Sequence, residues 1–174
     1  MIDLDLTGRN AIVTGASMGI GAATVRLLTD HGATVAFCAR GQDAVNELTA
    51  YGETIRGYVA DMSNADSTND FLERATAEMG DVDILVNNVG ASPSRNFLYM
   101  DDADWEQLFQ LNMMSAVRCT RHVLPRMRAQ QWGRIGMIST VGALYPNAAL
   151  IDYAATKSAM ISTAKALAGK YGQD

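Results

Sequence analysis

The sequence predicts an α/β protein built on a doubly wound parallel sheet, and three observations lead to this class. Five short apolar runs alternate with longer segments of helical periodicity. The first run passes directly into a glycine-rich turn and then into a helix. No linker, repeat or low-complexity tract interrupts the 174 residues, of which 48% are hydrophobic. We therefore expect a single domain over residues 1–174 with ample core material.

The expected elements follow from these periodicities and from the residues that begin and end them. Ser63 suits a helix start because it is a capping residue with an acidic side chain, Asp66, three positions later. Asp101 and Asp102 are candidate caps for the helix after the fourth strand. Pro125 removes a backbone donor, so we expect a kink or a break there. We predict strands at about 9–14, 34–39, 54–60, 83–87 and 134–138, and helices at about 20–30, 42–50, 64–79, 102–131 and 152–170.

The first strand ends in a glycine-rich turn that contains Gly15, Gly19 and Gly21. A strand, a glycine turn and a helix in this order are the context of a dinucleotide-binding fingerprint. Gly15 permits the tight turn, Gly19 lets the backbone approach a pyrophosphate, and Gly21 lets the helix lie close to the sheet. The free N–H groups at the start of the helix bind the anion. The turn therefore predicts a Rossmann fold that holds a dinucleotide.

Tyr153 and Lys157 are four residues apart in a segment of helical periodicity. Positions i and i+4 share a helix face, so the phenol and the ammonium would lie side by side. A free phenol, with a pKa of about 10, is a poor acid–base catalyst at neutral pH, and a nearby cation favours the phenolate. The alternative is a surface Tyr–Lys pair on an amphipathic helix. Because the glycine turn accompanies the pair, we interpret it as catalytic.

Three segments together resemble the short-chain dehydrogenase/reductase family: Thr14–Gly21, Asn87–Gly90 and Tyr153–Lys157. Their order, and the spacing of the glycines and of the Tyr–Lys pair, are similar to those of the commoner subtype. The resemblance implies a Rossmann fold and hydride transfer between a nicotinamide cofactor and a carbonyl or alcohol. Family members continue after such a helix with two more strands, a substrate loop and a further helix. The resemblance therefore implies a domain that is incomplete at its C-terminus, with the C-terminal strands absent.

The end of the second strand carries the signal for cofactor choice. An NAD-preferring site places a carboxylate there for the ribose hydroxyl, whereas this chain has Ala39 followed by Arg40. A guanidinium suits a 2′-phosphate, so we expect NADP(H) rather than NAD(H). The alternative is that Arg40 is a solvated charge that opens the next helix. Met18 weakens the NADP(H) interpretation, because relatives that prefer NADP often have a basic residue at its position.

Further cofactor contacts are implied by the resemblance. Asp61, after the third strand, matches the family residue that hydrogen-bonds the adenine ring. Asn88 and Gly90, after the fourth strand, match the pair beside which the backbone passes close to the cofactor. The expected cofactor site comprises Gly15, Ser17, Met18, Gly19, Ile20, Gly21, Arg40, Asp61, Met62, Asn88, Gly90, Tyr153 and Lys157.

The fifth strand is expected to supply the hydroxyl that hydrogen-bonds the substrate carbonyl in this family. Gapless register of the strand places Thr140 in this slot, at the usual separation from Tyr153, whereas the pattern Ser139-x-x-Gly142 favours Ser139. Both hydroxyls remain candidates. Asn112 resembles the helix asparagine that holds a water behind the lysine. The alternative is a polar residue inside a helix that is satisfied by its own backbone.

Together these residues predict a mechanism. Tyr153 protonates the carbonyl oxygen as the nicotinamide delivers hydride, and Lys157 assists the phenol and hydrogen-bonds the nicotinamide ribose. Ser139 or Thr140 orients the oxygen, and Asn112 with a water reconnects the site to bulk protons. Two other classes stay open. One is a catalytically silent NADP(H)-binding or interaction protein, and the other is an isomerase or epimerase that uses the same tyrosine.

Composition and charge argue against several partners. A net charge of −5 disfavours nucleic acid and anionic membranes. No apolar run approaches the roughly 18 residues of a membrane span and no signal peptide opens the chain, so we expect a cytoplasmic protein. Cys38, Cys119 and the two histidines lack ligand spacing, so no metal is expected. We expect a small-molecule carbonyl or alcohol substrate, and a homodimer or homotetramer formed through the helices at 102–131 and 152–170.

Overall fold

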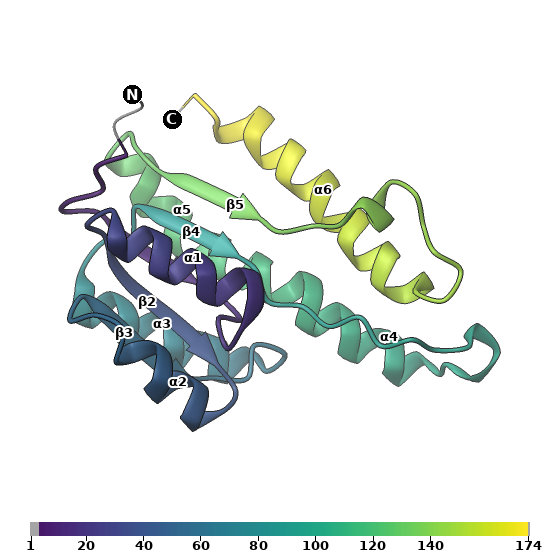
Figure 1. Cartoon of the computed structure of the whole chain (residues 1–174). Helices are drawn as coiled ribbons and strands as arrows, with labels where there is room; N and C mark the ends of the chain where they lie inside the picture. The colour runs from purple at the N-terminus through teal and green to yellow at the C-terminus, as the bar shows by residue number, and fades with distance from the viewer. Residues whose placement is uncertain (1–3, 174) are drawn as a thin grey trace.

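The computed structural model describes residues 4–173 and contains one five-stranded sheet with helices on both faces (Figure 1). The strand order is β3-β2-β1-β4-β5, and every neighbouring pair is parallel. The chain therefore moves outward from β1 in one direction and then returns to build the sheet in the other, which confirms the doubly wound fold. The strands are β1 (Asn10–Val13), β2 (Thr34–Ala39), β3 (Ile55–Val59), β4 (Ile84–Asn87) and β5 (Arg134–Met137).

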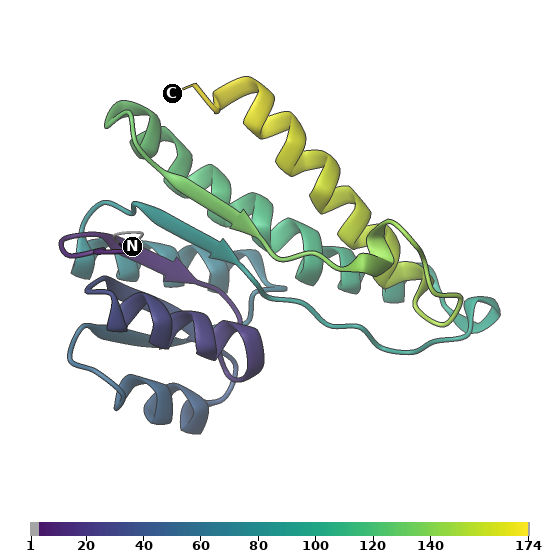
Figure 2. The same cartoon turned by 45° about the horizontal axis from the view of Figure 1, so that its top comes forward.

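The helices form two layers around the sheet (Figure 2). Val25 and Leu48 lie in the core cluster on one face, whereas Phe71 and Val123 lie in the cluster on the other face. The helices are α1 (Gly19–Asp30), α2 (Gln42–Thr49), α3 (Ala65–Met79), α4 (Asp102–Phe109), α5 (Ser115–Ala129) and α6 (Ile151–Tyr171), with short 3-10 turns at Phe97–Tyr99 and Val141–Ala143. Thus α1 and α2 cover one face, and α3 and α5 cover the other. The long α6 packs on α5 and the turn before it, through Met160.

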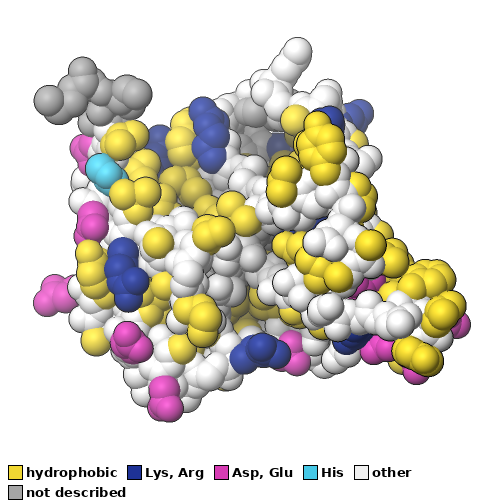
Figure 3. Space-filling model, turned by 45° about the vertical axis from the view of Figure 1, so that its right-hand side comes forward, with side chains coloured by type: hydrophobic (Ala, Val, Ile, Leu, Met, Phe, Trp, Pro, Cys, Tyr) yellow, Lys and Arg dark blue, Asp and Glu magenta, His cyan; other side chains and the backbone are white. Residues whose placement is uncertain are grey.

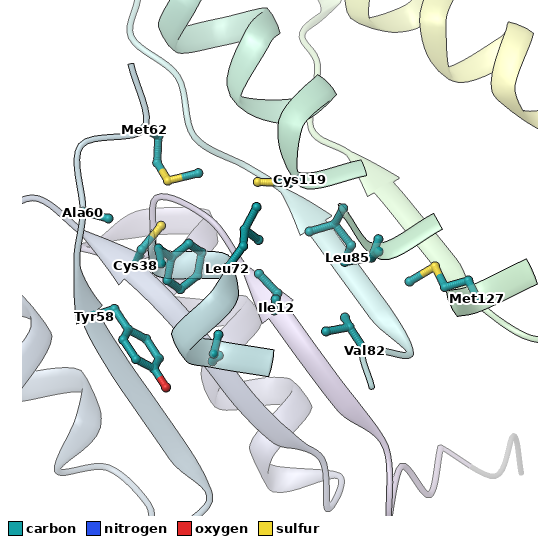
Figure 4. Close-up of a cluster of buried hydrophobic side chains, with 14 residues drawn as sticks. Ile12, Cys38, Tyr58, Ala60, Met62, Leu72, Val82, Leu85, Cys119 and Met127 are labelled. Atoms are coloured by element: carbon teal, nitrogen blue, oxygen red, sulfur yellow. The ribbon is translucent and has the colours of Figure 1, made fainter. Parts of the chain in front are cut away.

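The core between the sheet and the α3–α5 layer contains both cysteines (Figure 4). Cys38 on β2 and Cys119 on α5 are free and fully buried. Burial raises the pKa of the Cys38 thiol to about 12 and raises that of Cys119 as well. These thiols are therefore unreactive and pack as small hydrophobic groups, as the sequence predicted.

Two predicted helix starts are tested by the capping contacts. The cap of α3 is Asn64, whose Oδ1 accepts from the Ser67 N–H at 2.9 Å. The prediction of Ser63 was wrong by one residue, because the Ser63 hydroxyl donates to Asp61 instead. Asp101 caps α4 as predicted, in a reciprocal capping box with Asp104.

The helix predicted at 102–131 is interrupted, but not where the proline is. A π-helical turn at Gln110–Met114 separates α4 from α5, and α5 continues through Pro125. Val123 and Met127 on either side of the proline are buried in the core. Their packing outweighs the one backbone hydrogen bond that proline removes. Of the kink or break predicted at Pro125, the break was therefore wrong. The interruption instead surrounds Asn112, and π-helical turns are often found at functional sites.

Candidate active site

The glycine turn between β1 and α1 is shaped by contacts that leave no room for side chains. Gly15 has a φ of +68°, and a Cβ there would lie 2.8 Å from the Cα of Val89. A Cβ on Gly21 would lie 2.6 Å from the Gly15 carbonyl oxygen and 2.6 Å from the Asn88 amide nitrogen. Gly19, with a φ of +57°, faces open space. Packing therefore requires Gly15 and Gly21, whereas Gly19 leaves the backbone accessible to a ligand.

Asn88 fastens this turn from the end of β4. Its Nδ2 donates to the carbonyl oxygens of Thr14 and Gly15, at 3.0 and 2.9 Å. The Thr14 hydroxyl oxygen accepts from the backbone N–H groups of Asn88 and Val89, at 3.0 and 3.1 Å. These bonds hold the ends of two adjacent strands in one geometry. The sequence analysis assigned Asn88 to the site but missed Thr14, a buried threonine directly before the turn. The signal that could have identified Thr14 was its place at the start of the glycine motif.

A cavity of about 420 Å³ opens over the turn, at the carboxyl ends of the strands. Dinucleotides bind at this position in doubly wound sheets. The first turn of α1 has no side-chain cap and no acidic residue, so its N–H groups are left for an anion such as a pyrophosphate. The residues present therefore fit a dinucleotide. The cavity is lined by Gly15, Ser17, Met18, Ile20, Gly21, Cys38, Ala39, Arg40, Ala60, Met62, Asn88, Val89, Gly90, Ala91 and Leu111.

The residues expected to choose the cofactor lie at one end of this cavity. Ala39 and Arg40 line it, and Arg40 is exposed. Asp61 does not line it, and its Oδ1 accepts from the N–H and the hydroxyl of Ser63, at 3.0 and 2.7 Å. These two bonds, with a smaller contribution from the Arg40 guanidinium, lower the pKa of the Asp61 carboxyl. A cation thus follows β2, and a carboxylate with a lowered pKa follows the neighbouring strand β3.

Tyr153 and Lys157 lie one helical turn apart on α6, where Tyr153 is half-buried. Lys157 is only 3% exposed, and its Nζ donates to the Ile138 carbonyl oxygen at 3.0 Å and to the Met160 sulfur at 3.4 Å. Burial lowers the pKa of Lys157 to about 8. A Cβ on Gly90 would lie 3.1 Å from Nζ. The ammonium therefore lies directly behind the cavity wall that Gly90 forms.

Asn112 is fully buried and joins three segments of the chain. Its Oδ1 accepts from the Ala91 N–H at 2.9 Å, and its Nδ2 donates to the Ala91 carbonyl oxygen at 3.0 Å and to the Thr156 hydroxyl at 3.1 Å. Thr156 in turn donates to the Tyr153 carbonyl oxygen at 2.8 Å. The partners of the amide lie outside its own helix, so the alternative of local satisfaction was wrong. The water behind Lys157 stays a prediction.

The two candidate hydroxyls at the end of β5 make different contacts. Ser139 Oγ donates to the Lys157 carbonyl oxygen at 3.2 Å. Thr140 Oγ1 accepts from the Gly142 N–H at 3.2 Å and caps the 3-10 turn that follows. A second bond, from Ser158 Oγ to the Ala143 carbonyl oxygen at 2.7 Å, fastens that turn to α6. Both hydroxyls are thus placed on the same segment beside the helix of Tyr153.

Two charged residues that sequence reasoning missed lie next to the Tyr–Lys pair. Asp152 is 1% exposed in the first turn of α6, and Arg95 approaches it from the loop after β4. The position of Asp152 directly before Tyr153 was a signal in the sequence. Nothing in the sequence pointed to Arg95 as its partner, because the two residues are separated by most of the second half of the chain.

The strand order, the glycine turn and the cavity above them define a dinucleotide-binding protein of the Rossmann class. The family model for short chain dehydrogenases matches residues 9–174. The chain therefore belongs to the short-chain dehydrogenase/reductase family of oxidoreductases, which confirms the resemblance.

Individual relatives agree with this assignment. The chain is 39% identical over 171 residues to an uncharacterized oxidoreductase, YvrD, of Bacillus subtilis, covering 96% of this chain and 64% of that one. It is 34% identical over 166 residues to the 3-oxoacyl-[acyl-carrier-protein] reductase FabG of Salmonella typhimurium, covering 95% and 68%. A structure of a 3-oxoacyl (acyl-carrier-protein) reductase from Agrobacterium tumefaciens, with NADP bound, superposes with a TM-score of 0.89 at 32% identity, covering 98% and 68%. The chain thus spans about two thirds of the length of these relatives.

Two observations on residues 4–173 concern other kinds of site. None of the helices in this range is long and apolar enough to cross a membrane. Within the same range, no three His, Cys, Asp or Glu side chains are grouped so that they could hold a metal ion.

Proposed function

We propose that this protein interconverts a carbonyl and a secondary alcohol by hydride transfer with NADP(H), using Tyr153 as general acid and base. The placement of Lys157 carries the proposal. Its ammonium is buried, lies one helical turn from Tyr153, and meets the wall of the dinucleotide-sized cavity at Gly90. Burying a cation without a carboxylate partner lowers the stability of the fold. A phenol whose anion needs stabilising is a functional reason to retain such a cation. The nicotinamide supplies the hydride when it is bound.

In this proposal the side chains position the substrate and move one proton. Tyr153 gives its proton to the carbonyl oxygen during reduction and recovers it from the alcohol during oxidation. Lys157 stabilises the phenolate electrostatically. We assign the oxygen-orienting role to Thr140 rather than Ser139. The Ser139 proton is donated to the Lys157 carbonyl, whereas the Thr140 oxygen acts as an acceptor and its proton is left for the substrate.

The preference for NADP(H) rests on Arg40 and its surroundings. Arg40 lines the cavity beside Ala39, and among residues 4–173 no carboxylate lines the cavity with them. A guanidinium forms charge-assisted hydrogen bonds with a phosphate, whereas the ribose hydroxyl of NAD(H) needs an acceptor that Ala39 lacks. The Agrobacterium reductase that superposes on this chain contains NADP, which supports the same choice.

An apolar surface beside the catalytic pair bears on the substrate. Leu98 and Tyr99 are exposed on the 3-10 turn before α4, and Leu144 and Tyr145 are exposed after the 3-10 turn that precedes α6. Figure 3 shows hydrophobic side chains gathered on this side of the molecule. We propose a small substrate whose carbonyl carries an apolar group. A cytoplasmic setting and assembly into a homodimer or homotetramer through α5 and α6 are part of the same proposal.

The test is oxidation of NADPH by the purified protein across a panel of ketones, aldehydes and 3-oxoacyl thioesters. Tyr153→Phe should lower turnover at least about a hundredfold while the affinity for NADPH stays within about twofold, because only the transferable proton is deleted. Tyr171→Phe, on the same helix, is the matched control. A Tyr153→Phe variant that keeps more than about a hundredth of the wild-type rate would remove Tyr153 from this role.

A catalytically silent NADP(H)-binding protein is the second candidate function. The observation that favours it is that neither Tyr153 nor Lys157 is among the described residues that line the cavity. Tight NADPH binding with no turnover on any member of the panel would select this alternative. An isomerase or epimerase would instead be recognised by a product that shows no net oxidation or reduction.

A further inference from the structure

Asp152 is a buried carboxylate in the first turn of the catalytic helix. It is 1% exposed, and its Oδ1 accepts from the backbone N–H of Tyr153 at 2.8 Å. Leu150, at the N-cap of α6, provides no side-chain cap, so Asp152 satisfies one of the free N–H groups of the helix start. Its other oxygen, Oδ2, is buried and accepts no hydrogen bond from residues 4–173. A helix N-terminus favours an anion, but a buried carboxylate oxygen also needs a partner.

Arg95 provides the positive charge that faces this oxygen. Its Nη1 lies 3.9 Å from Asp152 Oδ2 and 2.9 Å from Asp104 Oδ1, and the arginine side chain is three-quarters buried. Asp104 belongs to the capping box at the first turn of α4. One guanidinium therefore connects the first turns of two helices, α4 and α6. Arg95 lies in the segment between β4 and α4. The beginning of this segment contributes Asn88 and Gly90 to the cavity.

The peptide groups of Tyr153 are consequently held at both ends. Asp152 accepts from its N–H, and the Thr156 hydroxyl donates to its carbonyl oxygen while accepting from Asn112. The Asn112 bond leads to the loop after β4 at Ala91, and the Asp152 pair leads to the same loop at Arg95. The backbone of the tyrosine is therefore positioned by two polar connections to one segment.

We propose that Arg95 and Asp152 are positioning residues that set the orientation of Tyr153 in the site. Without Arg95, the Asp152 carboxylate would be buried with only a neutral donor, and it would turn toward water and release the Tyr153 N–H. A displacement of about 1 Å at a reacting group is enough to lower a rate by up to about a hundredfold. The catalytic consequence rests on the proposed function, whereas the restraint on the Tyr153 backbone does not.

The structural part is tested by amide hydrogen exchange followed by NMR on the full chain. Arg95→Met keeps the length of the side chain and removes its charge, and it should speed exchange of the Tyr153 N–H at least about tenfold. The matched control is Arg74→Met, which removes the partner of Asp70 in an exposed ion pair on α3 and should leave this exchange unchanged. Unchanged protection of the Tyr153 N–H in a folded Arg95→Met variant would overturn the proposal, whether or not the protein proves to be an enzyme.

The catalytic part is tested by a double-mutant cycle on kcat. Arg95→Met should lower kcat about tenfold or more with the NADPH affinity within about twofold. Asp152→Asn keeps the size and the Oδ1 acceptor, and in that background adding Arg95→Met should change kcat less than about twofold, because Arg95 acts through the carboxylate. Multiplicative losses in the double variant, or equal losses of kcat and NADPH affinity, would show a general structural role and overturn the assignment. If Arg95→Met does not fold, the double variant, in which residue 152 no longer carries a buried charge, is compared with Asp152→Asn alone.

A failure of the proposed function gives a different pattern. In that case the wild type binds NADPH and turns over no substrate, and the exchange experiment still reports whether the pair restrains Tyr153.

Discussion

Replacing the buried Lys157 with methionine should stabilise the fold at neutral pH and should abolish the proposed hydride-transfer activity. The ordinary pKa of a lysine is 10.5, and burial lowers that of Lys157 to about 8 in the native protein. This difference corresponds to about 3 kcal/mol by which the fold is weakened when the ammonium is charged. Methionine is of similar length and removes that cost. It also leaves the Ile138 carbonyl oxygen without its donor, which costs about 1 kcal/mol, so the expected net gain at pH 7 is about 2 kcal/mol.

The pH dependence distinguishes this explanation from better packing alone. Between pH 8 and pH 10.5 the native lysine has lost its proton and the unfolded lysine has kept it, so the unfolded chain binds more protons and the stability of the wild type rises with pH. Below pH 8 both states hold the proton and the wild type bears the full cost. The advantage of Lys157→Met should therefore be largest at pH 7, shrink above pH 8, and be lost by about pH 10.5.

Urea unfolding at several values between pH 7 and pH 10, with thiols kept reduced, measures this difference. Lys165→Met removes an exposed lysine from the same helix and should change the stability little at any pH. A stability difference for Lys157→Met that stays constant across this range would refute the claim that the native site destabilises the ammonium. A loss of stability at pH 7 would refute it as well.

The other predictions concern the cofactor and the substrate oxygen. Arg40→Ala should weaken NADP(H) binding roughly ten- to a hundredfold, since a charge-assisted hydrogen bond to phosphate is worth about 1.5–3 kcal/mol, and should leave NAD(H) binding nearly unchanged. Fluorescence titration of both cofactors measures this, and equal affinities in the wild type would mean that Arg40 points away from the ribose. If Thr140 orients the substrate oxygen as proposed, Thr140→Val should lower kcat about a hundredfold, whereas Ser139→Ala should lower it only a few-fold, because only the former would remove a donor to that oxygen. The opposite order in steady-state rates would transfer the role to Ser139.

The fold could be predicted from the sequence because its signals are local. An apolar strand, a turn that no larger residue could form at Gly15, and a helix that must approach the sheet at Gly21 are encoded within a dozen residues. The same is true of Tyr153 and Lys157, whose spacing on one helix puts them on one face. Local patterns of this kind indicate both the fold class and the two ends of the site.

Long-range contacts explain what the sequence did not show. The π-helical turn around Asn112 follows from an amide that bonds to Ala91 and Thr156, far away in the chain, rather than from any helix-breaking residue. The predicted break at Pro125 failed for the related reason that tertiary packing outweighed a local preference. Periodicity carries no information about such pairings.

The polar contacts around the start of α6 connect this helix to the two loops that follow β4 and β5. Ser139 and Ser158 fasten the segment after β5 to this helix, and Asn112 and Arg95 fasten it to the loop after β4. The loop after β4 also lines the cavity, through Asn88, Gly90 and Ala91. A buried ammonium at Lys157 weakens the fold locally, and hydrogen bonds from both loops oppose that effect without neutralising the charge. The helix that carries Tyr153 and Lys157 is thus held by side chains from both loops, and within residues 4–173 no carboxylate forms an ion pair with the Lys157 ammonium.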